Sequence, residues 1–159
     1  MYFLIIYKYM GRKLLIFFTG LLFLLPVYLS AQTAAELEAM LQTQAVTNAQ
    51  AAKFVLASAE AEANISAENA FQQALSNGWL KKDAKSDGEI TLSRLSFLMM
   101  KAFNIKGGMM YSIAPGPRYA YKSMVSRNYI QGASDPGMNV DGERLLLILG
   151  KVISAEGGE

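Results

Sequence analysis

An internal repeat constrains the fold of this chain more than any other feature of its sequence. A shift of 50 residues aligns residues 70–103 with residues 120–153 without a gap. Five of the 34 aligned pairs are identical, and most of the others keep the same physical character, apolar with apolar and polar with polar. Repetition at a fixed period is typical of proteins assembled from one supersecondary unit. The sequence therefore predicts at least two copies of such a unit.

The first half of each copy is predicted to be a short amphipathic helix. Apolar side chains recur at helical spacing in both copies: Phe71, Ala74 and Leu75 in one, and Tyr121, Met124 and Val125 in the other. Gly78 and Asn128 then occupy one aligned position. Glycine and asparagine adopt the left-handed backbone more readily than other residues, and such a residue commonly ends a helix. Both helices are expected to end there.

The second half of each copy is predicted to be a longer helix with an N-terminal cap. Thr91 and Asp141 are aligned, and both side chains can accept hydrogen bonds from the free amides of a first helical turn. Apolar residues continue at helical spacing up to Phe103 and Ile153. Glycine pairs at residues 107–108 and 157–158 are expected to end the two runs.

A partial third copy is predicted upstream. Val46 and Thr47 repeat the apolar residue and the cap, and Gln50 stands where a capping box needs its second polar side chain. Residues 33–63 are rich in alanine, so they could instead form one long helix. No unit could bury both of its helices alone. We therefore expect an all-α fold, in which about two and a half tandem helix–loop–helix repeats form one compact helical domain after an N-terminal signal helix.

Residues 1–31 have the three parts of an export signal. A basic start at residues 11–13 precedes an apolar run at residues 14–25 and a cleavage region at residues 26–31. Met10 could be the true start. Cleavage after Ala31 predicts a periplasmic or cell-envelope protein. The alternative is an uncleaved helix that anchors the chain in the inner membrane, although the apolar run is shorter than the roughly 20 residues that span a bilayer.

Composition limits the chemistry of the exported part. Cleavage would remove Lys8, Arg12 and Lys13 from the 15 basic residues, which leaves 12 basic against 13 acidic residues and a formal charge of −1. A near-neutral domain gives no electrostatic indication of nucleic-acid binding. The chain has no His and no Cys, so common zinc sites, thiol nucleophiles and Ser-His triads cannot be built. We expect a protein that is not an enzyme and that has no catalytic residues, cofactor or bound metal.

Residues 83–94 resemble a calcium-binding loop only superficially. Such a loop needs oxygen ligands at its third and twelfth positions, and this chain has Lys85 and Arg94 there. Neither side chain can donate an oxygen ligand. A solvated connection between two helices is favoured over a calcium site.

A Gly/Pro loop is predicted at residues 107–118. It carries three consecutive candidate contact residues, Met109, Met110 and Tyr111, and it ends at Arg118. Two interpretations remain open. The apolar side chains could cover the core between two units, or they could form an exposed loop that recognises a protein partner, because adaptable methionine surfaces suit such contacts.

From Tyr119 to Ile153 the chain resembles an S-layer homology (SLH) repeat, in a degenerate form. The family pattern has an aromatic-Ala opening, a short helix, a turn with Gly and apolar residues, a Gly/Asp-rich loop with Pro, and Ile-Thr-Arg-Ala-Glu at the second helix. Residues 119–121, 129–132, 134–137 and 140–141 follow this order, and residues 78–80 and 90–91 match it in the earlier copy. The resemblance implies non-covalent attachment of an exported protein to cell-wall polysaccharide or peptidoglycan.

The carry-over of that family's binding residues fails at the most important position. Directly after Thr91 and Asp141, where the family has its ligand-associated Arg, this chain has Leu92 and Gly142. The candidates Arg94 and Arg144 follow two positions later, which is about 200° around a helix. Their guanidinium groups could bind the carboxylates or phosphates of a wall polymer, or they could form ordinary surface ion pairs.

The sequence thus predicts a signal at residues 1–31, an Ala-rich segment with the partial repeat at 32–65, and helix–loop–helix units at 66–106 and 119–159 around the loop at 107–118. We expect an exported, non-catalytic envelope protein that binds cell-wall polysaccharide or peptidoglycan. The alternative is a periplasmic protein–protein adaptor or structural subunit that has lost carbohydrate binding. The expected partner is a wall polymer or an envelope protein, with no nucleic acid and no membrane after signal cleavage.

Overall fold

The computed structural model describes residues 34–59, 65–132 and 134–156. The export signal predicted at residues 1–31 therefore lies outside the described residues. The chain divides into two units, one up to Ala39 and one from Met40 onward. Residues 34–41 are helical, so this helix begins in the first unit and ends in the second. The remaining helices all belong to the second unit.

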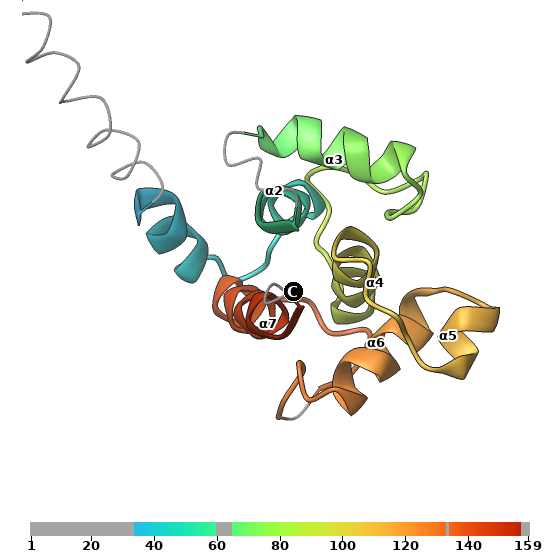
Figure 1. Cartoon of the computed structure of the whole chain (residues 1–159). Helices are drawn as coiled ribbons and strands as arrows, with labels where there is room; N and C mark the ends of the chain where they lie inside the picture. Colours follow the sequence, from blue (N-terminus) through green and yellow to red (C-terminus); the bar gives the residue numbers. More distant parts are fainter. Residues whose placement is uncertain (1–33, 60–64, 133, 157–159) are drawn as a thin grey trace, which may run out of the picture. The chain divides into compact units, whose positions relative to one another are not determined.

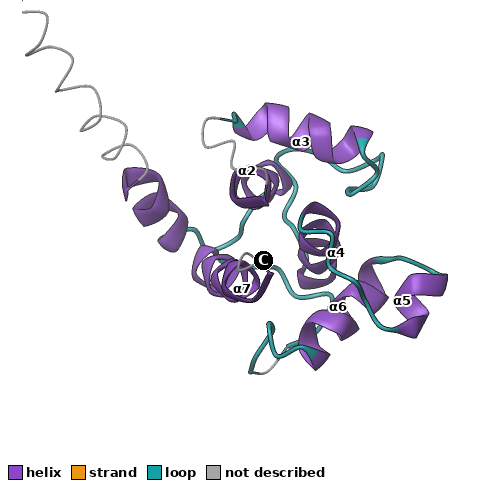
Figure 2. Cartoon of the chain, viewed as in Figure 1, coloured by secondary structure: helices purple, strands orange, loops and turns teal. Residues whose placement is uncertain are grey.

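Helices make up most of the second unit (Figures 1 and 2). Within the described ranges no residue belongs to a strand, and the pairs Thr47–Glu89 and Thr91–Asn139 form isolated antiparallel bridges. The predicted helical fold is confirmed at that level. None of the described helices combines the length and the apolar character needed to cross a membrane. The helices are α2 Asn48–Ala59, α3 Ala67–Ser76, α4 Leu92–Ala102, α5 Met109–Ile113, α6 Pro117–Ser126 and α7 Gly142–Glu156.

The core lies around α2, α4 and α7, which are seen nearly end-on in Figure 1. α2 contacts both α4 and α7. α3 packs against α2, and α6 packs against α4, so each of these outer helices covers the core helix that precedes it in the sequence. Completely buried side chains come from all three core helices and include Val55, Leu56, Leu95, Met99, Leu145 and Val152.

Three extended segments, one directly before each core helix, form a closed ring of backbone hydrogen bonds. The amide of Ile90 donates to the carbonyl of Val46 (2.9 Å), and the amide of Val140 donates to the carbonyl of Ile90 (3.2 Å). The amide of Val46 donates to the carbonyl of Val140 (2.8 Å) and closes the ring. All three side chains are completely buried. Because buried amides and carbonyls need partners, the ring satisfies groups that lie where water cannot reach them.

A second set of hydrogen bonds joins the same three segments. In each case the amide two residues after the ring residue donates to a carbonyl of the neighbouring segment: Asn48 to Gly88 (2.8 Å), Leu92 to Met138 (2.8 Å) and Gly142 to Thr43 (2.9 Å). Each pair of neighbours is therefore held by at least two backbone bonds. The β-branched residues at the ring positions suit this extended backbone.

The predicted helix starts are confirmed at α2 and α7. The amide of Gln50 donates to Oγ1 of Thr47 (3.2 Å), and the amide of Thr47 donates back to Oε1 of Gln50 (2.9 Å), which is the expected capping box. Oδ1 of Asp141 accepts from the amide of Arg144 (2.7 Å). The alternative of one long helix over residues 33–63 is wrong, because the chain leaves helical geometry before Val46 to join the ring.

The predicted cap at Thr91 is wrong in its detail. Thr91 precedes α4, but its side chain accepts no hydrogen bond from the first turn. Its hydroxyl lies 3.4 Å from the hydroxyl of Ser93 instead. A nearby hydroxyl thus competes with the backbone amides for the threonine side chain, as short polar side chains often do.

The predicted helix ends at Gly78 and Asn128 are confirmed. Their φ angles are +69° and +63°, in the left-handed region. The end predicted for the next helix at residues 107–108 is wrong, because α4 ends at Ala102 and Asn104 takes the left-handed conformation (φ +52°). All three ends are closed by the same backbone bond over five residues: Trp79 to Ala74 (2.8 Å), Ile105 to Met100 (2.8 Å) and Tyr129 to Met124 (3.0 Å).

The loop predicted at residues 107–118 is also partly wrong. Residues Met109–Ile113 form the short helix α5, and α6 begins at Pro117, before the end of the predicted loop. Proline suits the first turn of a helix because its fixed φ angle is already helical and its missing amide has no helical partner to lose.

Gly142 gives a direct test of how closely the chain approaches itself at the ring. A Cβ atom there would overlap the carbonyl oxygen of Met40, so Gly142→Ala is expected to lower the free energy of unfolding by about 3 kcal/mol. Gly150→Ala in the same helix is the matched control, since a Cβ at that position meets nothing within 4 Å. The control is expected to stabilise by up to about 1 kcal/mol. Urea unfolding followed by circular dichroism measures both, and equal stabilities would contradict the close approach.

Candidate functional site

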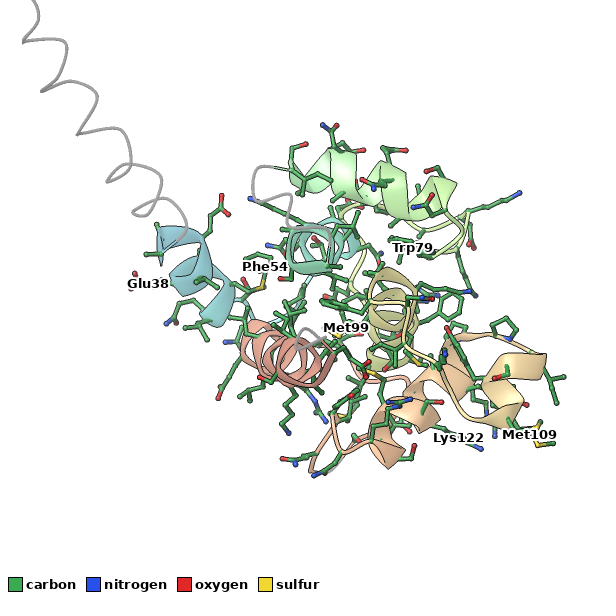
Figure 3. All side chains as sticks on the ribbon, viewed as in Figure 1. Glu38, Phe54, Trp79, Met99, Met109 and Lys122 are labelled. Carbon is green, nitrogen blue, oxygen red and sulfur yellow. The ribbon has the colours of Figure 1, made fainter. Side chains whose placement is uncertain are left out.

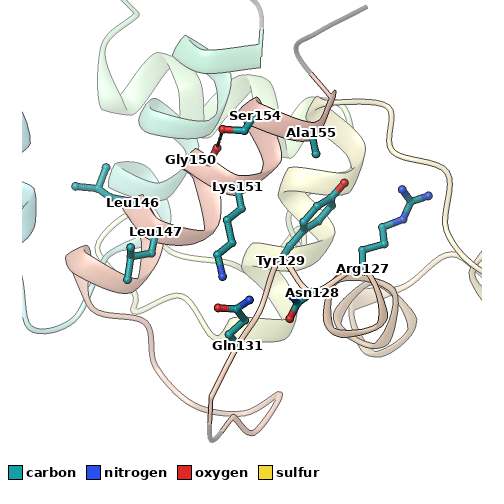
Figure 4. Close-up of a pocket in the computed structure, with 10 residues that line it drawn as sticks. All are labelled: Arg127, Asn128, Tyr129, Gln131, Leu146, Leu147, Gly150, Lys151, Ser154 and Ala155. Carbon is teal, nitrogen blue, oxygen red and sulfur yellow. Dashed lines mark hydrogen bonds between the residues drawn. The ribbon is translucent and has the colours of Figure 1, made fainter.

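A surface depression of about 630 Å³ lies between the turn after α6 and one face of α7 (Figure 4). It is open to solvent rather than enclosed, which suits a polymer or an extended surface better than a small molecule that must be shielded from water. The turn and three successive turns of α7 supply its lining residues, Arg127, Asn128, Tyr129, Gln131, Leu146, Leu147, Gly150, Lys151, Ser154 and Ala155.

The local sequence explains why the depression exists. The left-handed backbone of Asn128 ends α6 and turns the chain toward α7. Tyr129 and Ile130 then become buried, while Gln131 stays exposed. On α7, Gly150 has no side chain to fill the space between the helix and the turn. The hollow therefore follows from a helix stop on one side and a glycine on the other.

One wall of the depression is held by a polar cluster at the end of α7. The hydroxyl of Tyr129 donates to Oε1 of Glu156 (2.6 Å), and Nη1 of Arg127 lies 3.3 Å from the same oxygen. Nη2 of Arg127 also donates to the carbonyl of Lys106 (2.5 Å). Burial raises the pKa of Tyr129, and its hydrogen bond to Glu156 raises it further, while Arg127 lowers it. The tyrosine therefore stays a neutral donor, and the charges of Arg127 and Glu156 offset each other.

Lys151 supplies a positive charge to the depression, and no carboxylate of the described residues pairs with it. Its side chain extends across the hollow toward Gln131 and Asn128 (Figure 4). No hydrogen bond or ion pair joins its ammonium group to any residue that the structure describes. Beside it lie the half-buried Leu146 and the exposed Leu147. This combination can bind an anionic ligand that also has hydroxyl groups and a partly apolar face.

The structure does not bring Arg94 and Arg144 to this depression. They are the third residues of α4 and α7, both are half-buried, and neither lines the hollow. Gly142 stands where the family pattern has its ligand-associated Arg. Because a Cβ atom at Gly142 would overlap the carbonyl oxygen of Met40, a side chain at that position would require the backbone to shift.

The predicted loop carries four candidate residues, and the structure assigns some of them to the core and leaves the others exposed. Tyr111 is buried, and its ring lies edge-on to Phe97 with the centroids 6.3 Å apart. Met109 and Met110 are exposed by 77% and 53%, and Arg118 is exposed as well. Tyr111 therefore covers the core, and the two methionines project from it. A second depression of about 340 Å³ lies beside them, between α5 and α6.

Sequence reasoning missed the residues that line the main depression. Lys151 belonged to one of the five identical pairs of the repeat, with Lys101, and that identity was the available signal. The two lysines nevertheless differ in their surroundings, because the ammonium group of Lys101 lies 5.6 Å from the centre of the Phe97 ring. In the described part of the chain no three His, Cys, Asp or Glu side chains gather as a metal site, and this includes the loop at residues 83–94.

Comparison of the chain with protein-family models, with curated protein sequences and with solved structures finds no significant match.

The variant Tyr129→Phe tests the polar cluster through the pH dependence of the unfolding free energy. Because folding raises the pKa of Tyr129 above its ordinary value of 10.0, the stabilisation by the neutral hydroxyl is complete below that value and is lost as the pH rises through the higher folded pKa. At neutral pH the variant is expected to lose about 1–2 kcal/mol of unfolding free energy, since a hydrogen bond to a charged group is removed.

In strong alkali the difference in unfolding free energy between the variant and the unmodified protein should become smaller. Tyr119→Phe is the matched control, because the Tyr119 hydroxyl has no hydrogen-bond partner among the residues that the structure describes. Denaturant unfolding at neutral pH and at about pH 11 measures the effect. If the difference in unfolding free energy is the same at both pH values, the Tyr129 hydroxyl does not link stability to pH.

Proposed function

We propose that this chain is an exported, non-catalytic envelope module of the S-layer homology type, and that it binds cell-wall polysaccharide or peptidoglycan. The resemblance of residues 119–153 and of the earlier copy to that family is the starting point. The closed ring at Val46, Ile90 and Val140 is the observation that carries the proposal.

The ring supports a repeat of three units rather than two and a half. Each ring residue is buried, each is followed by a core helix, and each is bonded to the other two in the same way. In the sequence, Val46 belonged to the partial copy, whereas Ile90 and Val140 belonged to the two full ones. A segment that takes an equal place in a closed ring is best explained as a copy of the same unit. Three copies are also what members of the family often carry.

The depression beside α7 is the proposed contact for the wall polymer. Lys151 can meet a carboxylate or a phosphate, and the exposed amides of Gln131 and Asn128 can bind sugar hydroxyls. Leu147, which is 60% exposed, offers an apolar surface for a sugar face. Arg144 lies at the start of the same helix and could extend the contact along α7. The proposed role is non-catalytic because the chain has no His and no Cys, the side chains that most often serve as general base and as thiol nucleophile.

Export is part of the proposal because an envelope ligand requires it. Its support is the pattern of residues 1–31, with a basic start, an apolar run and a cleavage region. Every buried apolar side chain of the described residues lies between Met40 and Val152. The part from residue 32 onward therefore contains all of the described core.

A protein–protein adaptor is the second candidate function. The observation that favours it is the exposure of Met109, Met110 and Ile113 on α5, since large apolar side chains gathered at a surface often mark a contact. An adaptor would keep the fold and would not need the depression beside α7. The two candidates therefore use different surfaces and can be separated by mutation.

Sedimentation with purified peptidoglycan sacculi tests the proposed function. The chain from residue 32 onward is expected to pellet with sacculi and to be released by soluble wall fragments. Lys151→Gln removes the charge of the depression and should weaken retention about tenfold, the loss expected for a hydrogen bond to a charged group. Lys82→Gln, in the exposed loop between α3 and α4, removes the same charge elsewhere and is the matched control.

If the unmodified chain stays in the supernatant instead of pelleting with the sacculi, the result would contradict wall binding and favour the adaptor. Equal retention of the two lysine variants would leave wall binding in place but remove the depression as its site. Release of soluble sugar from the sacculi would contradict a non-catalytic role.

A further inference from the structure

The helix α5 presents three large apolar side chains to solvent. Met109, Met110 and Ile113 are exposed by 77%, 53% and 69%. Figure 3 shows Met109 at the outer edge of α5, on the side away from the core helices, with Lys122 of α6 close to it. We call this group of three residues the α5 tip. Of the large apolar side chains in the described residues, Met109 and Ile113 have the highest exposed fractions.

The tip is held in place by packing rather than left as a loose loop. Tyr111, between the exposed residues, is buried against Phe97. The amide of Gly108 donates to Oγ of Ser123 (3.3 Å), and a Cβ atom at Gly107 would overlap the Tyr111 ring. The chain therefore crosses close to that ring and enters α5 in a fixed direction. The exposure of the three apolar side chains is a consequence of this anchoring.

The tip lies in the middle of a strongly basic stretch. No Asp or Glu occurs between Glu89 and Asp135. That interval contains six basic residues: Arg94, Lys101, Lys106, Arg118, Lys122 and Arg127. Among these, Lys106, Arg118 and Lys122 are exposed and closely flank α5 in the sequence or in space.

Lys122 has a particular place among these cations. It lines the second depression together with Met109, Met110, Tyr119 and the hydroxyl residues Ser123 and Ser126. Its ammonium group has no hydrogen bond or ion pair with the residues that the structure describes. A phosphate at this place would meet a positive charge directly beside apolar side chains.

We propose that the α5 tip docks on the surface of an anionic lipid bilayer. Met109, Met110 and Ile113 enter the boundary between headgroups and acyl chains, and Lys106, Arg118 and Lys122 meet the lipid phosphates. Apolar side chains surrounded by Lys and Arg are the pattern of proteins that lie on membranes. This inference departs from the expectation of no membrane contact after signal cleavage, which rested on the loss of the leader rather than on a local surface.

The shape of the tip favours a bilayer over a protein partner. An amphipathic helix of a partner needs an apolar groove to lie in, whereas these three side chains project from a short helix. The neighbouring depression, at about 340 Å³, has the volume for a headgroup but not for a helix. A single short insertion binds weakly, so the contact should be reversible and sensitive to salt. The proposal does not depend on wall binding, because the tip and the depression beside α7 share no residue.

Vesicle sedimentation tests the proposal with the chain from residue 32 onward, which contains all of the core described above. Vesicles of phosphatidylcholine with phosphatidylglycerol are compared with vesicles of phosphatidylcholine alone. We expect retention on the anionic vesicles that falls with added salt, and little retention on the neutral ones. Ile113→Gln should lower the partition coefficient about tenfold, and Lys122→Gln about fivefold. Ile153→Gln, at a 41% exposed residue of α7, is the matched control and should change nothing.

Because the chain has no Cys, a single Ile113→Cys substitution places an environment-sensitive fluorophore at the tip alone. Its emission should shift to shorter wavelength with anionic vesicles, and the same label at Ile153→Cys should not respond. Absence of binding, equal binding to both vesicle types, or unchanged binding of Ile113→Gln would each overturn the proposal. A dimer in solution that Ile113→Gln dissociates, without vesicle binding, would assign the tip to a second copy of the chain instead.

Discussion

The backbone amides of Val46, Ile90 and Val140 each donate to a carbonyl of a neighbouring segment, so three parts of the chain that are far apart in sequence meet at one closed ring. The ring residues are completely buried, and leaving any of these amides without a partner there would cost free energy. Since a core helix begins directly after each ring residue, the ring fixes where α2, α4 and α7 start and therefore how they meet. The same crowding leaves room only for glycine at position 142.

Both surfaces that we connect with function depend on this arrangement. The depression beside α7 needs the turn after α6 to lie against the helix that leaves the ring at Gly142. The α5 tip needs α4 and α6 to be fixed against each other, because Phe97 of α4 packs against Tyr111 within α5 and Ser123 of α6 accepts a hydrogen bond from Gly108 just before it. Wall binding through Lys151 and lipid contact through Ile113 would thus use separate faces. An exported module with both could sit between a membrane and the wall polymer.

Local signals in the sequence predicted the helices better than they predicted the site. The capping box at Thr47 and Gln50 and the helix ends at Gly78 and Asn128 depend on a few consecutive residues, so they could be recognised without the fold. The helix end at Asn104 was not predicted, because the glycines at residues 107–108 offered a stronger local signal. The predicted cap at Thr91 does not form, because the hydroxyl of Ser93 lies close to the Thr91 hydroxyl. The ring, the depression and the exposure of the α5 tip arise from contacts across long stretches of sequence. No local pattern contains them.

Amide hydrogen exchange, measured residue by residue by nuclear magnetic resonance, tests the closed ring most directly. If the ring holds the three segments equally, the amides of Val46, Ile90 and Val140 should exchange only when the whole domain unfolds, and all three should report the same free energy. A Val46 amide that exchanges orders of magnitude faster than the other two would contradict this account, because the first segment would then be an addition to a two-unit protein rather than a member of the ring.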